Sequence, residues 1–121
     1  MSGVPEVVAL YLYGSAARGE LARDVDLAVV VHGAVSHALI ERWAAELQRR
    51  ALPRGPEIDL RVASGAAPRF RATVVREGRL LYARTEGARR AFETRALSDW
   101  FDFQPTWERM RRRMLDRWTR G

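Results

Sequence analysis

Residues 11–31 read YLYGSAARGELARDVDLAVVV, an apolar run that stops at a polar loop and then resumes. The first run begins at Val7, is rich in β-branched and aromatic side chains, and predicts a strand buried on both faces. The second run, residues 24–31, predicts another strand and opens with two aspartates one residue apart. Because like charges this close repel each other, their pairing indicates a site that uses both.

Helix and strand patterns alternate after this stretch. Ser36 can cap a helix that runs to about Ala51, with an apolar stripe along one side. Residues 57–63 alternate polar and apolar side chains and predict a third strand. A short helix over 68–77 and an edge strand over 79–84 complete the series. We therefore expect an α/β fold, with a small mixed sheet flanked by helices and a helical C-terminal tail.

The tail begins near residue 85 and is rich in arginine. Pro105 is expected to divide it into two helices, 86–103 and 105–119, because proline removes a helical hydrogen bond. The whole length of 121 residues suits one domain, with a core over about 5–84 and the tail over about 85–119.

Composition excludes several classes of chemistry. The chain has no cysteine, which rules out disulfides and thiolate metal sites and fits a reducing compartment. All 21 basic residues are arginine, so mechanisms that depend on a lysine Schiff base or a P-loop lysine are excluded. No signal peptide or membrane-spanning run is apparent, and the expected location is the cytoplasm.

Carboxylates are the first candidates for a functional site. Asp24 and Asp26 share one face of their strand, and Glu57 and Asp59 share one face of another. If those strands are neighbours, three or four carboxylates converge, which is typical of a site for Mg²⁺ or Mn²⁺. Of the four, Glu57 is better explained as a solvated strand residue than as a ligand.

A phosphate-binding turn is the second candidate. Gly14 ends a strand and permits close backbone approach, and the amides that follow it, at the start of an expected short helix, can hold phosphate oxygens. The hydroxyl of Ser15 is a further donor, and Arg18 lies one helical turn beyond it. For Arg18, phosphate contact and an ordinary surface position remain equally open.

Gly14-Ser15 followed by Asp24-Val-Asp26, with Asp59 on a later strand, resembles the signature of the polymerase-beta-like nucleotidyltransferases. The chain is most similar to the minimal nucleotidyltransferases (MNT), small proteins that often act as antitoxins beside HEPN toxins. YLYGSAARGE, DVDLAVV, IDL, VVREGRLLY and FETRALSDWFDFQP all agree, so the resemblance extends over nearly the whole chain from residue 7.

The resemblance implies a division of roles. Asp24, Asp26 and Asp59 would be catalytic and hold two Mg²⁺ ions, or Mn²⁺, while Asp59 helps to activate the attacking hydroxyl. Gly14, Ser15 and Arg18 would bind the nucleotide. The implied reaction transfers AMP from ATP to a hydroxyl of a partner protein, a HEPN toxin, so that the chain acts as an antitoxin.

Two alternatives stay open beside this activity. The loop between Ser15 and Asp24 is shorter than is usual in the family, so the chain could instead neutralise its partner by occlusion, with little or no catalysis. Transfer to a small molecule such as an aminoglycoside is the other alternative, although no second domain for such an acceptor is evident.

The tail carries an apolar stripe whose function the sequence leaves open. Trp107, Met110, Met114 and Trp118 recur at helical spacing among arginines. They could pack on the chain's own core, or form a surface for a homo- or hetero-oligomer. Direct binding of nucleic acid is disfavoured, because no groove-reading motif is present. The two histidines, His32 and His37, are expected at the surface.

Overall fold

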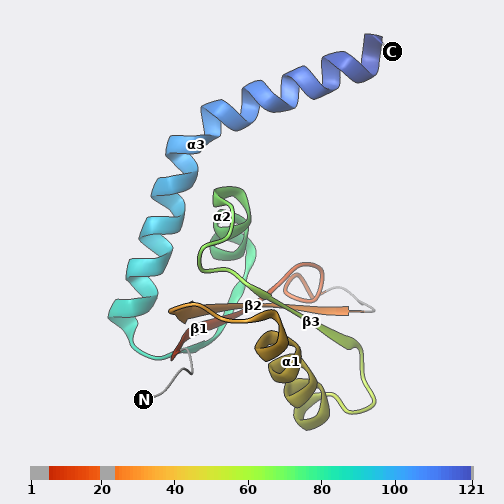
Figure 1. Cartoon of the computed structure of the whole chain (residues 1–121), viewed down its shortest axis with the longest axis vertical. Coiled ribbons are helices and arrows are strands. Elements are labelled where there is room, and N and C mark those ends of the chain that lie inside the picture. The colour runs from red at the N-terminus through yellow and green to blue at the C-terminus, as the bar shows by residue number, and fades with distance from the viewer. Residues whose placement is uncertain (1–5, 20–23, 121) are drawn as a thin grey trace.

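The protein is described by a computed structural model that covers residues 6–19 and 24–120 (Figure 1). The elements occur in the order expected from the sequence. They are β1 (Glu6–Tyr13), β2 (Asp24–His32), α1 (His37–Ala51), β3 (Glu57–Val62), α2 (Pro68–Glu77), β4 (Arg79–Ala83) and α3 (Glu86–Arg120). Ser36 is the N-cap of α1, and its hydroxyl accepts a hydrogen bond of 3.1 Å from the amide of Leu39. Within the described ranges, no helix has the length and apolarity needed to cross a membrane.

The four strands form a mixed sheet in the order β3-β2-β1-β4. The central pair β1–β2 and the edge pair β1–β4 are antiparallel, whereas β2 and β3 are parallel. β4 is an edge strand, as expected, and pairs only with β1. Because α1 lies between β2 and β3 in the chain, it provides the crossover that a parallel pair requires.

Helices cover both faces of the sheet, so the core has two halves (Figure 1). α1 covers one face, where Leu27, Val29, Ile58 and Leu60 are buried. α2 and the first part of α3 cover the other face, where Tyr11, Tyr13 and Val74 are buried. β1 contributes side chains to both halves, but only those on the α2 side are fully buried, so the expectation of burial on both faces holds in part.

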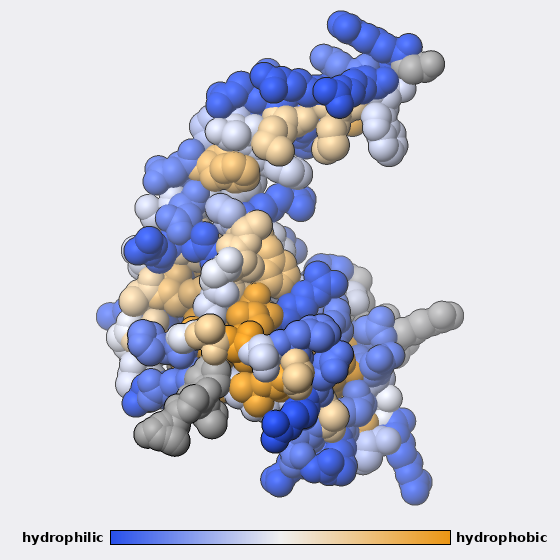
Figure 2. All heavy atoms as spheres, viewed as in Figure 1, coloured by the Kyte–Doolittle hydropathy of each residue, from blue (hydrophilic) through white to orange (hydrophobic). Residues whose placement is uncertain are grey.

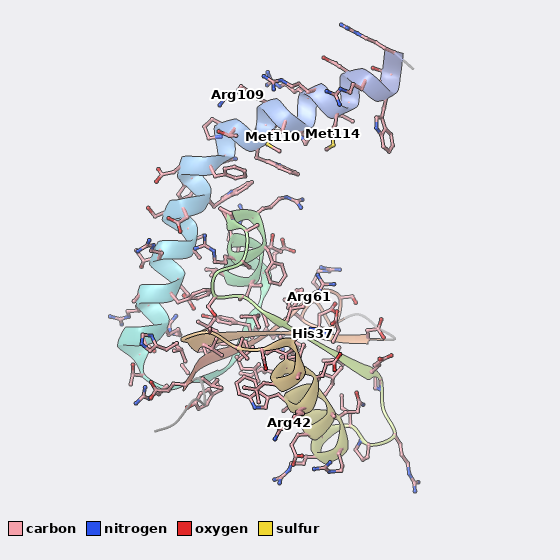
Figure 3. All side chains as sticks on the ribbon, viewed as in Figure 1. His37, Arg42, Arg61, Arg109, Met110 and Met114 are labelled. Atoms are coloured by element: carbon pink, nitrogen blue, oxygen red, sulfur yellow. The ribbon has the colours of Figure 1, made fainter. Side chains whose placement is uncertain are left out.

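α3 is one helix from Glu86 to Arg120, so the expected division at Pro105 is wrong. The helix bends sharply partway along instead, and the bend precedes the labelled Arg109 (Figures 1 and 3). Proline lacks the amide proton and its ring clashes with the preceding turn, which bends a helix without ending it when flanking turns are stable. We call residues 105–120 the distal arm.

The first part of α3 is held firmly against the domain. Trp100 and Ala96 are buried, and Asp99 accepts a hydrogen bond of 2.8 Å from Nη1 of Arg71 in α2. The Arg71 guanidinium holds the pKa of Asp99 below its usual range. At the start of the arm, the Arg69 guanidinium lies 4.9 Å from the centroid of the Trp107 ring. These contacts fix the direction in which the arm leaves the domain.

Candidate active site

The strand register places the predicted carboxylates in two neighbouring pairs. Asp24 lies opposite Glu57, and Asp26 lies opposite Asp59, across the parallel strands β2 and β3. Their neighbours along the strands, Leu27 after Asp26 and Ile58 between Glu57 and Asp59, are buried beneath α1. Since side chains alternate across a strand, the four carboxylates belong to the opposite face, which α2 and α3 cover elsewhere. The sequence-based expectation that these strands are neighbours is confirmed.

Asp26 is the electrostatic centre of this group. Burial raises the pKa of its carboxyl above the usual range, and the nearby Asp59 raises it further. Arg61 has the opposite influence, while Asp24 adds a smaller repulsion. Ionisation of Asp26 is therefore less favourable in the isolated protein than in water. A bound cation would stabilise the ionised carboxylate.

Arg61 is a member of the site that the sequence analysis missed. It lies two residues after Asp59 on β3, and its Nε is 3.4 Å from Oδ2 of Asp59. Figure 3 shows it on the side of β3 that faces the distal arm. The alternation of residues 57–63 could have identified it, because positions 57, 59 and 61 must share one face.

Gly14 forms the other wall of the site. Its φ is +75°, in the left-handed region, and a Cβ atom placed on it would lie 2.6 Å from Oδ2 of Asp26. Only glycine permits both this backbone conformation and so close an approach to the carboxylate. The backbone at the end of β1 is thereby brought directly against the acidic group.

The residues after Gly14 form consecutive turns in place of the short helix expected there. The amides of Ala17, Arg18 and Gly19 donate to the carbonyls three residues earlier, at 3.1, 3.1 and 3.2 Å. The amides of Ser15 and Ala16 precede these bonds, so they are the ones positioned to meet a phosphate. Ser15 is half-buried beside them.

Arg18 is placed at the surface, next to α2. Its Nη1 is 3.9 Å from Oε1 of Glu77, and both side chains are half-exposed. An exposed pair at this distance contributes little free energy, ~0–1 kcal/mol.

Tyr13 closes the site from the side of the core. It lies opposite Asp26 in the β1–β2 register and is buried. Its ring meets that of Phe70 edge to face at a centroid distance of 5.4 Å. Burial raises the pKa of the Tyr13 hydroxyl, Arg61 lowers it, and Asp26 and Asp59 raise it. The pKa of the Tyr13 hydroxyl therefore depends on the charges of Asp26, Asp59 and Arg61.

Gln48 fixes the start of β3, and no sequence signal distinguished it from the other polar residues of α1. Its Nε2 donates to the carbonyls of Leu52 and Pro56 at 2.7 and 2.9 Å. Its Oε1 accepts from the amide of Ile58 at 2.7 Å. One side chain therefore joins the end of α1, the following loop and the strand that carries Asp59.

The chemistry of these donors fits a hard divalent cation, because carboxylate oxygens are the ligands that Mg²⁺ prefers. Their spacing is less complete: in the part of the chain that the structure describes, no three acidic or histidine side chains are gathered closely enough to enclose a metal. Repulsion from Asp59 and Asp24 raises the pKa of Asp26, and Arg61 is the cation that lies beside Asp59.

The remaining sequence-predicted residues are exposed at the surface. Glu57 is exposed, as expected. His32 is exposed at the far end of β2, and His37 is exposed at the start of α1, where its Nε2 is 3.0 Å from Oε1 of Glu41. Both histidines are surface residues, as the sequence predicted.

Comparison with protein families agrees with this geometry. The family model described as "Polymerase beta, Nucleotidyltransferase" matches residues 1–87, which is well over half of the 121 residues. The chain belongs to this nucleotidyltransferase family. A comparison with curated protein sequences found no match.

Solved structures share the fold. One is a crystal structure of a toxin–antitoxin with AMP-PNP, at a TM-score of 0.79 and 22% identity, covering 93% of this chain and 89% of that chain. Another is a tri-AMPylated Shewanella oneidensis HEPN toxin in complex with MNT antitoxin, at a TM-score of 0.74 and 21% identity, covering 93% and 86%. A third, the toxin–antitoxin MntA-HepT, has a TM-score of 0.74 and 20% identity, covering 93% and 87%. Identities this low show a common fold.

Proposed function

We propose that the chain is a metal-dependent adenylyltransferase that moves AMP from ATP to a hydroxyl of a HEPN-type toxin and thereby acts as an antitoxin. The observation that carries the proposal is the meeting of Asp26 and Asp59 across β2 and β3, with the backbone of Gly14 against the Asp26 carboxylate. Acidic side chains beside a tight glycine turn bring a cation and a polyphosphate together.

Each residue has a distinct role in this proposal. Asp24, Asp26 and Asp59 hold Mg²⁺, two ions being expected and Mn²⁺ an acceptable substitute. When bound, the metal neutralises the carboxylates and the phosphate charge and acts as a Lewis acid. The backbone and hydroxyl of Ser15 bind phosphate oxygens, and the Arg18 guanidinium is a further phosphate ligand in this proposal.

The transfer is a substitution at the α-phosphorus of ATP. A bond forms between the acceptor hydroxyl oxygen and the α-phosphorus, and the bond from that phosphorus to the oxygen that bridges it to the β-phosphate breaks. Pyrophosphate leaves with the electron pair, and the hydroxyl proton passes to the carboxylate of Asp59. Arg61 lies next to Asp59 and can keep that carboxylate oriented while it accepts the proton.

The proposed acceptor, a partner protein, is suggested by the solved structures that share this fold. Toxin–antitoxin complexes, one with AMP-PNP and one with an AMPylated HEPN toxin, support a protein acceptor and an adenine nucleotide. A small-molecule acceptor has no comparable support.

Label transfer from α-³²P-ATP tests this function. With Mg²⁺ and the product of the adjacent gene tested as the acceptor, wild type should label that protein, and the label should be lost with EDTA or in the double variant Asp24→Ala, Asp26→Ala. Equal labelling by the double variant would refute the assignment of these residues.

Occlusion without catalysis is the second candidate, because two observations favour it. Among residues 6–19 and 24–120, the carboxylates are not gathered around a metal position, and the distal arm exposes apolar side chains. On this hypothesis, the double aspartate variant still neutralises the toxin in cells. Loss of neutralisation in that variant, with the complex still formed, would leave catalysis as the mechanism.

A further inference from the structure

The distal arm presents a continuous apolar stripe to solvent. Met110, Met114 and Trp118 recur every four residues and therefore share one helix face. Their exposed fractions are 48%, 52% and 85%, so the stripe does not pack on the chain's own core. For these three residues it excludes packing on the chain's own core, whereas Trp107, the fourth residue of the predicted stripe, is half-buried beside Arg69.

Arginines border the stripe. Arg113 and Arg117 follow Met110 by three and seven residues, which places them along one edge, and within the described residues neither makes an ion pair. The two acidic residues of the arm, Glu108 and Asp116, are each offset by two positions from a methionine and so lie away from the stripe. The arm therefore offers an apolar centre with a basic rim, which is the composition of a protein interface that has an acidic counterpart.

The stripe points toward the side of the molecule that holds the candidate active site. Figure 3 shows Met110 and Met114 on the inner side of the bent helix and Arg109 on its outer side. Figure 2 shows the open space between the arm and the domain, with apolar residues along the arm's inner edge and hydrophilic ones along its outer edge. Asp59 and Arg61 belong to the sheet face on this same side.

The charge of the arm argues against a second copy of this chain as the occupant. Between residues 105 and 120 there are six arginines and two acidic residues, and the whole chain has a formal charge of +6. Two such arms in contact would bring like charges together, which is unfavourable. Nucleic acid would match the arginines, but duplex phosphates offer nothing to an exposed row of Met and Trp side chains.

We propose that the distal arm is the docking surface for the acceptor protein, which binds in the open space between the arm and the site with an apolar patch rimmed by acidic residues. The proposal rests on the proposed function, since it names how that acceptor is held. The bend at Pro105 directs the arm, and the Arg69–Trp107 contact holds its first turn in place. Docking on the arm brings an acceptor hydroxyl to the same side of the sheet as Asp59.

The test is a calorimetric titration of the full chain with the same adjacent-gene product as the acceptor protein. The double variant Met110→Asp, Met114→Asp should raise Kd by at least tenfold, because central apolar residues dominate interface affinity. Arg112→Asp is the matched control, since it lies on the opposite helix face and changes the net charge by the same amount. It should leave Kd within about twofold of wild type, as surface positions outside an interface do. Circular dichroism should show all variants folded.

The outcomes separate this proposal from the proposed function. The Asp24→Ala, Asp26→Ala variant should bind the acceptor like wild type even though it transfers no AMP. Absence of AMP transfer by wild type would refute the function while leaving arm-dependent binding measurable. The docking proposal is overturned if the methionine variant binds like wild type. It is also overturned if that variant instead dissolves a dimer of this chain or abolishes binding to DNA with no change toward the acceptor.

Discussion

The backbone of Gly14 lies against the carboxylate of Asp26, so that a Cβ atom on residue 14 would be 2.6 Å from Oδ2. This contact joins the end of β1 to the start of β2. The proposed phosphate-binding turn and the proposed metal-binding carboxylate therefore lie side by side. In the proposed function, phosphate binding depends on the turn, and metal binding depends on the carboxylate. A shift of the Gly14 backbone would therefore disturb the Asp26 carboxylate as well.

Gly14→Ala is therefore expected to displace Asp26 and abolish metal binding. The predicted result is a loss of about 100-fold or more in AMP transfer, because misplaced catalytic groups cost at least that much. Gly19→Ala is the matched control, since Gly19 has a φ of +77° but a Cβ atom on it would lie within 4 Å of no atom of the described residues. Both variants should lose about 1–2 kcal/mol of stability through backbone strain. Equal Mn²⁺ affinity of the two variants would contradict the prediction that the close approach of Gly14 to Asp26 is needed for metal binding.

Asp26→Asn should stabilise the metal-free protein at neutral pH. The pKa of Asp26 is raised in the folded state, so the native protein binds the extra proton more tightly than the unfolded chain does. Stability is consequently lost as pH rises from the unfolded value through the raised pKa, and asparagine removes this loss. In EDTA, Tm of the variant should exceed that of wild type at pH 7, with the difference vanishing in acid.

Added Mg²⁺ should reverse that order. It should raise Tm of wild type and leave Asp26→Asn unchanged, because the variant lacks the charge that the cation neutralises. If Mg²⁺ left the Tm of the wild-type protein unchanged, that result would argue against the metal site.

Arg61→Gln should strengthen binding of Mn²⁺ in the absence of nucleotide. Arg61 is 3.4 Å from Asp59 and competes with a metal for that carboxylate. Because an exposed ion pair contributes ~0.2–1 kcal/mol, affinity should rise by up to about fivefold. Arg61→Lys keeps the charge and should remain close to wild type. Titration of Mn²⁺ followed by electron paramagnetic resonance measures both, and weaker binding in Arg61→Gln would show that Arg61 assists the metal instead.

Pro105→Ala should straighten α3. The substitution restores a helical hydrogen bond and removes the ring clash that favours the bend. Small-angle X-ray scattering should then give a larger maximum dimension, and the acceptor should bind more weakly as the arm swings away. Pro68→Ala is the control, because Pro68 begins α2 at a position where proline fits a straight helix. An unchanged scattering profile would mean that Arg69 and Trp107 hold the bend without the proline.

Local patterns in the sequence were sufficient to predict the order of the elements, the cap at Ser36 and the pairing of Asp24 with Asp26 on one face. These features depend on periods of two and 3.6 residues and on the chemistry of single side chains, which neighbours in the chain define. The same reasoning failed at Pro105, because a proline can bend or end a helix and the packing of α3 on α2 decides between them.

The sequence by itself determined an α/β chain with a glycine-serine turn and acidic residues on two strands. Only the tertiary structure decided that Asp26 lies opposite Asp59 and that the Arg61 guanidinium lies beside the Asp59 carboxylate. It alone also decided that Gln48 holds the start of β3 by a hydrogen bond. It also decided that Met110 and Met114 remain exposed. These relationships join residues far apart in the chain, and strand register, helix packing and the direction of a bend set them through contacts that no local pattern records.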